Sequence, residues 1–138
     1  MNSFWSLVGV SLLLGLASGC AYTPTPLRGA PEQHGGAVRF ALRMPSAHRV
    51  QVVGSWEGNA WGGLAESGAW LDPRRGALSD PDGDGVWERI VFLPAGYHTY
   101  RFVVDGTLWL VDPSNPERTR HNGAESSVLV VQGDFGSR

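Results

Sequence analysis

Apolar side chains recur at every second position from Val38 to Met44, in the segment AVRFALRM at positions 37–44. A period of two belongs to a β-strand that buries one face, because successive side chains of a strand point to opposite sides. Pro45 follows directly and ends the run. This segment therefore predicts a half-buried strand.

Similar strand signals recur along the chain between turns rich in Gly and Pro. We expect strands at 37–44, 48–53, 86–93, 97–105, 108–111 and 127–131, with 69–71 as an optional short extra strand. No segment shows a helical period with caps. A chain of 138 residues, 42% of them hydrophobic, is long enough for one compact domain. Six or seven strands at short spacing predict an all-β fold, an antiparallel β-sandwich.

The N-terminus carries an apolar run, Phe4 to Ala17, that is too short for a typical membrane-spanning helix. It leads into Ala17-Ser18-Gly19-Cys20, which resembles the lipobox of bacterial lipoproteins. Cys20 is the only cysteine, and lipidation accounts for a lone thiol in an exported protein. We predict a lipoprotein signal peptide at 1–19 and a lipidated Cys20, with ordinary cleavage or an unprocessed tail as alternatives. The protein would then be anchored in the lipid bilayer of a bacterial cell envelope, the outer membrane being favoured by Ala21.

The rest of the chain divides by composition. The segment 21–36 has three Pro, three Gly and no apolar period, so we expect residues 20–36 to form a flexible tether. The folded module is expected at 37–133, and 134–138 is expected to be a C-terminal tail.

Charge and motifs argue against several classes of function. A net charge of −2 with no block of basic residues disfavours nucleic acid and anionic lipid headgroups as partners. The chain has no nucleophile-elbow pattern and no phosphate loop. His98 and His121 are isolated, so no zinc site is expected.

Paired carboxylates could in principle form the active site of a glycosidase, yet a small sandwich offers no deep cleft. We therefore expect that the protein is not an enzyme and has no cofactor. The acids considered are Glu57, Glu66, Asp72, Asp105 and Asp112.

The order of several motifs resembles the family 48 carbohydrate-binding modules. These motifs are VQVVGSW, NAW, LPAGYHTYRFVVDG, WLVDPSNP and NGAESSVLVV, which together span most of 37–131. The family includes the glycogen-binding domain of the AMP-activated protein kinase beta subunit and the early-set domains of isoamylases and branching enzymes. The resemblance implies an immunoglobulin-like (early-set) antiparallel sandwich of about seven strands. It also implies non-catalytic binding of α-1,4-linked glucans such as glycogen or starch.

The same resemblance implies a set of sugar-binding residues. Trp61 and Trp109 match the two aromatic platform positions, and Arg101 matches the basic residue between them. Longer loops leave Trp56 as a rival of Trp61, and Leu108 as a rival of Trp109. In the final loop the matching positions are Asn122, Ala124 and Ser126, where Ser126 is shorter than the family's Asn and has fewer donors.

Each aromatic residue also has an ordinary structural interpretation. Trp87 shares a strand face with Val91 and Leu93, which indicates the core, and Trp56 stands where the family packs a Phe inward. Arg101 could simply lie on a solvated face. The alternative function is therefore a protein–protein interaction module with a decayed sugar site, which the replacements at Asn122, Ala124 and Ser126 favour.

The stretch DPDGDGVWE at 80–88 places Asp80, Asp82 and Asp84 at alternating positions, as a calcium loop would. The twelfth position of such a loop, which needs a bidentate Glu, is Val91. We therefore interpret the stretch as a turn whose backbone the Asp side chains cap. A weak ion site, and with it a calcium-dependent adhesin, remains the third option.

Overall fold

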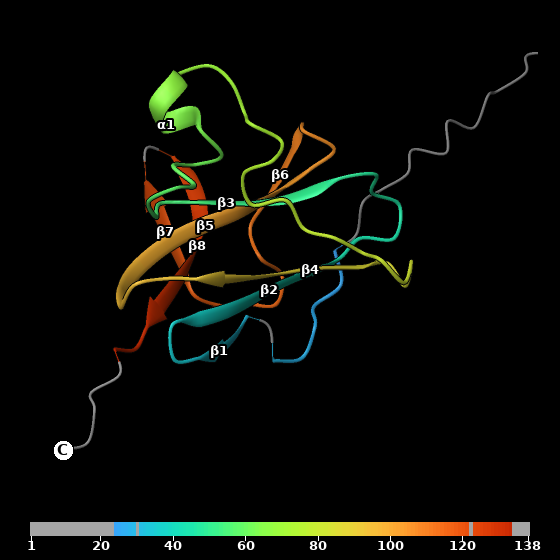
Figure 1. Cartoon of the computed structure of the whole chain (residues 1–138), viewed down its shortest axis with the longest axis horizontal. Helices are drawn as coiled ribbons and strands as arrows, with labels where there is room; N and C mark the ends of the chain where they lie inside the picture. The colour runs from blue at the N-terminus through green and yellow to red at the C-terminus, as the bar shows by residue number, and fades with distance from the viewer. Residues whose placement is uncertain (1–23, 30, 122, 134–138) are drawn as a thin grey trace, which may run out of the picture.

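Eight strands and one short helix make up the part of the chain that the structure describes (Figure 1). The structure is a computed structural model that describes residues 24–29, 31–121 and 123–133. The strands are β1 (Glu32–His34), β2 (Ala37–Arg43), β3 (Val50–Gly54), β4 (Val86–Phe92), β5 (Gly96–Val104), β6 (Leu108–Leu110), β7 (Arg118–His121) and β8 (Ala124–Val131), and the helix is α1 (Leu64–Ser67).

The strands form two antiparallel sheets. The smaller sheet has the order β1-β2-β4, and the larger has the order β3-β5-β8-β7, with β6 added beside β5 (Figure 1). The two sheets pack face to face, because the buried faces of β2, β3, β5 and β8 contribute to one hydrophobic core. The predicted all-β, immunoglobulin-like antiparallel sandwich is confirmed, with eight strands in place of about seven.

The core follows the alternation that the sequence displays on β2. Val38, Phe40, Leu42 and Met44 are each no more than 2% exposed. They meet the inward side chains of the larger sheet, which are Val50, Val52, Tyr100, Phe102, Val104, Leu129 and Val131.

Of the two tryptophans that the sequence assigns to the core, Trp56 lies within it and Trp87 is half-buried against it. Trp56 is 7% exposed and stacks on Phe40, with the ring centroids 5.7 Å apart. Trp87 packs against the core, and its indole N–H donates to the carbonyl of Met44 at 3.1 Å. Trp56 therefore belongs to the core and is not a rival of Trp61 as a sugar platform.

The prediction of a tether at 20–36 is wrong for its described residues. β1 pairs with β2, with Glu32 opposite Arg39 and His34 opposite Ala37. Gly35, at φ 59°, lies in the tight turn that joins the two strands. Upstream, Leu27 N donates to Ser114 Oγ at 2.7 Å, so this segment lies along the sandwich. A Pro- and Gly-rich composition did not prevent pairing, because the open edge of β2 offers free backbone groups.

Two other expectations about elements differ from the structure. Residues 69–71 form no strand, and Trp70 is 75% exposed. β7 was not predicted, because Arg118–His121 lacks an apolar alternation; it forms by pairing with β8 at the sheet edge.

Several predictions fall on residues that the structure does not describe. These are the signal peptide at 1–19, the lipidated Cys20 and the tail at 134–138. Among the described residues, no helix has the length and apolar character needed to cross a membrane.

Candidate functional site

Residues far apart in the sequence meet at a cavity of about 450 Å³ on the outer face of the larger sheet. It gathers four of the predicted sugar-binding residues, Trp61, Arg101, Trp109 and Ser126. The full lining is Trp61, Leu64, Ala65, Arg101, Trp109, His121, Ala124 and Ser126.

Strand alternation directs Arg101 and Trp109 toward this cavity. Arg101 lies between Tyr100 and Phe102, which are both fully buried in the core, so Arg101 points outward. Trp109 is opposite Val103 on the neighbouring strand and faces outward with it. Leu108 instead packs against the core. Of the two rivals in this segment, Trp109 is the one that lines the cavity.

The loop after β3 presents Trp61 in a strained backbone conformation. Trp61 has φ 57° and Ala60 has φ 45°, both in the left-handed region that L-residues with a side chain avoid. The N–H of Trp61 donates to the carbonyl of Gly54 at 2.8 Å, which closes the loop back onto the strand. Strain of this kind persists only where the surroundings enforce it, and it gathers at functional sites.

Asn59 is the residue that enforces this loop. It is 3% exposed, and its Oδ1 accepts hydrogen bonds from Gly54 N at 2.8 Å and Gly62 N at 2.9 Å. Its Nδ2 donates to the carbonyl of Val52 at 2.9 Å. Asn59 therefore positions Trp61 without lining the cavity. This role of Asn59 was not predicted, although a lone Asn in a loop rich in Gly is the sequence signal that could have revealed it.

Arg101 is half-buried, and one hydrogen bond holds its guanidinium group. Its Nε donates to the carbonyl of Glu125 on β8 at 2.5 Å. Guanidinium has five N–H donors, so the others remain available to a ligand with oxygen acceptors. This arrangement differs from that of a freely solvated arginine, because the hydrogen bond holds the charged group at the cavity that Trp61 and Trp109 also line.

The remaining candidates divide into three groups. Ala124 and Ser126 lie in the cavity, Trp56 lies in the core, and Asn122 is outside the described residues. His121, Leu64 and Ala65 line the cavity and were not predicted to do so. They come from β7 and α1, which are among the elements that the sequence pattern did not reveal.

Two of the acids considered for catalysis serve the framework. Asp112 is fully buried, and its carboxylate accepts hydrogen bonds from Tyr100 Oη at 2.7 Å and Ser114 N at 2.8 Å. Burial raises the pKa of Asp112, and burial likewise raises the pKa of Tyr100. Asp105 accepts hydrogen bonds from the N–H groups of His48 and Arg49, at 2.8 and 2.9 Å. Both carboxylates thus hold turns, as their motifs predicted.

The three aspartates of the loop before β4 act on their own backbone. Asp80 Oδ2 accepts from Gly85 N at 2.9 Å, and Asp84 Oδ1 accepts from Val86 N at 2.8 Å. Desolvation within the loop raises the pKa of Asp80, and the hydrogen bond to Asp80 lowers that of Asp82. The capping role is confirmed. One carboxylate oxygen from each aspartate lies within 4.8 Å of the others, so an ion site there stays a prediction.

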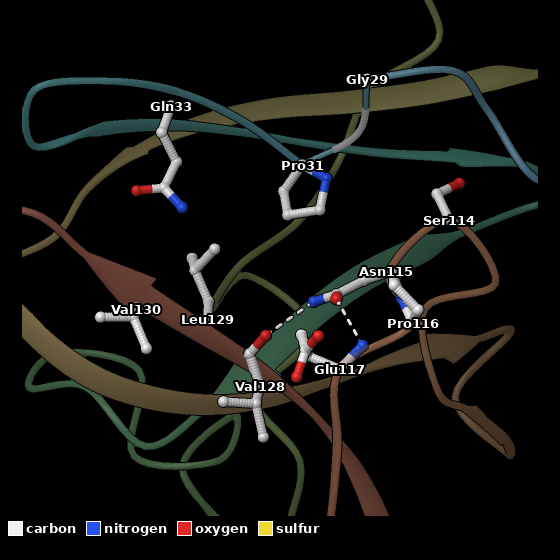
Figure 2. Close-up of a pocket in the computed structure, with 10 residues that line it drawn as sticks. All are labelled: Gly29, Pro31, Gln33, Ser114, Asn115, Pro116, Glu117, Val128, Leu129 and Val130. Atoms are coloured by element: carbon white, nitrogen blue, oxygen red, sulfur yellow. Dashed lines mark hydrogen bonds between the residues drawn. The ribbon is translucent and has the colours of Figure 1, made fainter.

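A second cavity, of about 510 Å³, is lined by residues of β1 and the segment before it, of the loop before β7, and of β8 (Figure 2). Figure 2 shows Asn115 among its lining residues; Nδ2 donates to the carbonyl of Val128 at 2.7 Å, and Oδ1 accepts from Glu117 N at 3.0 Å. The amide of Asn115 is therefore used to hold the loop against β8. Of the predicted sugar-binding residues that the structure describes, none lines this cavity.

Comparison of the chain with models of known protein families finds no match, and comparison with curated proteins finds no similar protein. The function of the chain is therefore inferred from the cavity that Trp61, Arg101, Trp109 and Ser126 line.

Proposed function

We propose that the protein is a non-catalytic carbohydrate-binding module of the family 48 kind, which binds α-glucan such as glycogen or starch. The observation that supports it is that Trp61, Arg101, Trp109 and Ser126 line a single cavity although they come from four separate segments. We further propose that acylated Cys20 holds the module in the bacterial cell envelope.

The residues of the cavity suit a sugar for physical reasons. One face of a glucose ring consists of C–H groups, and an indole ring can lie flat against it with little loss of side-chain entropy. Trp61 and Trp109 supply two such rings. Arg101 and Ser126 then supply hydrogen-bond donors for the hydroxyl groups at the ring edge. Of the described residues that line the cavity, none is an Asp or Glu.

Titration of the full chain with glycogen and β-cyclodextrin tests the proposal, with tryptophan fluorescence and gel retardation as readouts. We expect Trp61→Ala and Trp109→Ala each to weaken binding by about tenfold or more, because each removes one stacking surface. Trp70→Ala is the matched control, since Trp70 is 75% exposed and does not line the cavity. Absence of binding by the unaltered chain, or equal binding by all variants, would refute the proposal.

The alternative function is a protein–protein interaction module on the same sandwich. It is favoured by Ala124 and Ser126, whose short side chains offer little reach toward a sugar. Affinity purification of the full chain from cells lacking polysaccharide discriminates the two functions. Stoichiometric recovery of one protein, released by Trp61→Ala, would favour the alternative.

A further inference from the structure

The outer face of the larger sheet continues beyond the cavity toward the start of β5. Tyr97, Thr99 and Arg101 follow one another at two-residue steps on β5, so their side chains lie on the same face. The positions between them, His98 and Tyr100, are buried. Tyr97 therefore lies on the same face of the larger sheet as the cavity, about 13 Å from Arg101 along the strand.

β8 supplies the neighbours of these residues. Val128 is opposite Thr99, and Val130 is opposite Tyr97. Figure 2 shows the side chains of Val128 and Val130 on one side of β8 and that of Leu129 on the other. Tyr97 is 60% exposed and Val130 is 51% exposed. We refer to Tyr97, Thr99, Val128 and Val130 as the Tyr97 patch.

The Tyr97 patch combines an aromatic ring with hydroxyl groups. Tyr97 is exposed, and its hydroxyl has no hydrogen-bond partner among the residues that the structure describes. Ser55 lies beside Thr99, and its Oγ accepts a hydrogen bond from Thr99 N at 3.1 Å, which leaves the hydroxyl hydrogen of Ser55 free to donate. An aromatic surface followed by hydroxyl donors is the same combination that suits a sugar at the cavity.

We propose that the Tyr97 patch is a second sugar-binding subsite, which takes up the continuation of a glucan chain held at the cavity. The inference rests on the proposed function, because it requires that the cavity itself binds glucan. Once one part of a chain is bound, contact of a later part with Tyr97 is an intramolecular event at high effective concentration. The patch therefore adds affinity for long chains and none for short ones.

A second exposed apolar pair lies on the other sheet and lacks these features. Ile90 and Phe92 on β4 are 60% and 81% exposed, on a face where Arg39 pairs with Glu32 and Glu88. Neither residue lines the cavity. Phe92 thus provides a matched control, because Phe92→Ala removes an exposed aromatic ring from the smaller sheet, away from the Tyr97 patch.

The test compares a short and a long α-1,4-linked glucan, maltotriose and maltodecaose, by calorimetric titration of the full chain. We expect the unaltered chain to bind maltodecaose more tightly. Tyr97→Ala should weaken maltodecaose binding by about fivefold and leave maltotriose binding unchanged. Tyr97→Phe should retain the affinity within about twofold, because the ring remains. Phe92→Ala should match the unaltered chain with both sugars.

The outcomes separate this inference from the proposed function. Binding of both sugars with no effect of Tyr97→Ala would overturn the subsite and leave the cavity's function standing, and failure to bind either sugar would overturn both. If Tyr97→Ala instead dissociated a dimer in light scattering, the patch would be a self-association surface and the inference would be wrong. Val130→Ser is a second variant, on β8, and should also weaken only maltodecaose binding.

Discussion

At the scale of single residues, Asn59 determines whether Trp61 can serve as a platform. Its buried side chain accepts hydrogen bonds from Gly54 N and Gly62 N and donates one to the carbonyl of Val52. Asn59→Ala would leave these groups without partners, and we expect it to lower the free energy of unfolding by about 3 kcal/mol. It should also weaken glucan binding as strongly as Trp61→Ala. Urea unfolding measures the first effect and fluorescence titration the second.

The matched control for Asn59→Ala is Ser67→Ala. The Ser67 hydroxyl also bonds the backbone, at Trp70 N and O, but at an exposed position where water can replace it. We expect Ser67→Ala to cost less than about 1 kcal/mol and to leave binding intact. Equal stability losses in the two variants would contradict the role assigned to Asn59.

The left-handed conformation of Trp61 leads to a second prediction at this scale. Trp61→Ala keeps a Cβ at φ 57°, whereas Trp61→Gly removes it. Both variants lose the indole ring, so their difference isolates the backbone strain. We expect Trp61→Gly to be more stable than Trp61→Ala by about 1 kcal/mol in urea unfolding, since Gly adopts this region without steric cost. The reverse order of stability would show that the loop carries no strain there.

At the scale of elements, the sequence predicted strands with a buried face and missed those without one. Val38 to Met44 alternate visibly because they fill the core, and the same regularity directed Arg101 and Trp109 outward. β1 and β7 have no such face: they form by pairing with edges that other strands leave open. His121, which β7 brings to the cavity, could not be found for this reason.

Removal of the segment before β2 tests the contribution of β1. A chain that begins at Ala37 loses the β1–β2 pairing and the bond from Leu27 to Ser114. We expect its free energy of unfolding to fall by at least about 2 kcal/mol relative to a chain that begins at Ala21, because several backbone hydrogen bonds are lost. Urea unfolding of the two chains measures the difference. Coincident transitions would restore the interpretation of this segment as a tether.

At the scale of the whole molecule, burial of Tyr100 makes folding sensitive to alkaline pH. The pKa of Tyr100 is raised above the usual tyrosine value of about 10, so the folded state retains a proton that the unfolded state releases. Stability is therefore complete below about pH 10 and declines as the pH rises above it, by about 1.4 kcal/mol per unit for one such group. The chain contains no Lys, so its tyrosines dominate titration in this range. The expected decline is measured by urea unfolding from neutral to alkaline pH.

Tyr100→Phe should flatten this decline, although it also lowers stability at neutral pH by removing the hydrogen bond to Asp112. Tyr97→Phe is the control, because Tyr97 is exposed, and it should keep the slope of the unaltered chain. If the free energy of unfolding of Tyr100→Phe fell with rising pH as steeply as that of the unaltered chain, a group other than Tyr100 would cause the decline.

The proposed anchor at Cys20 and the residues of the proposed sugar site are different positions of the whole chain, so location and binding should change independently. Cys20→Ala removes the only thiol available for lipidation. The variant cannot carry acyl chains at residue 20 and so loses its proposed anchor. We therefore expect it to move from the membrane fraction to the soluble fraction of expressing cells. Its affinity for glycogen should stay unchanged, since none of the cavity residues is altered. Fractionation followed by titration measures both effects, and retention of Cys20→Ala in the membrane fraction would mean that the apolar run at 4–17, and not a lipid, holds the protein there.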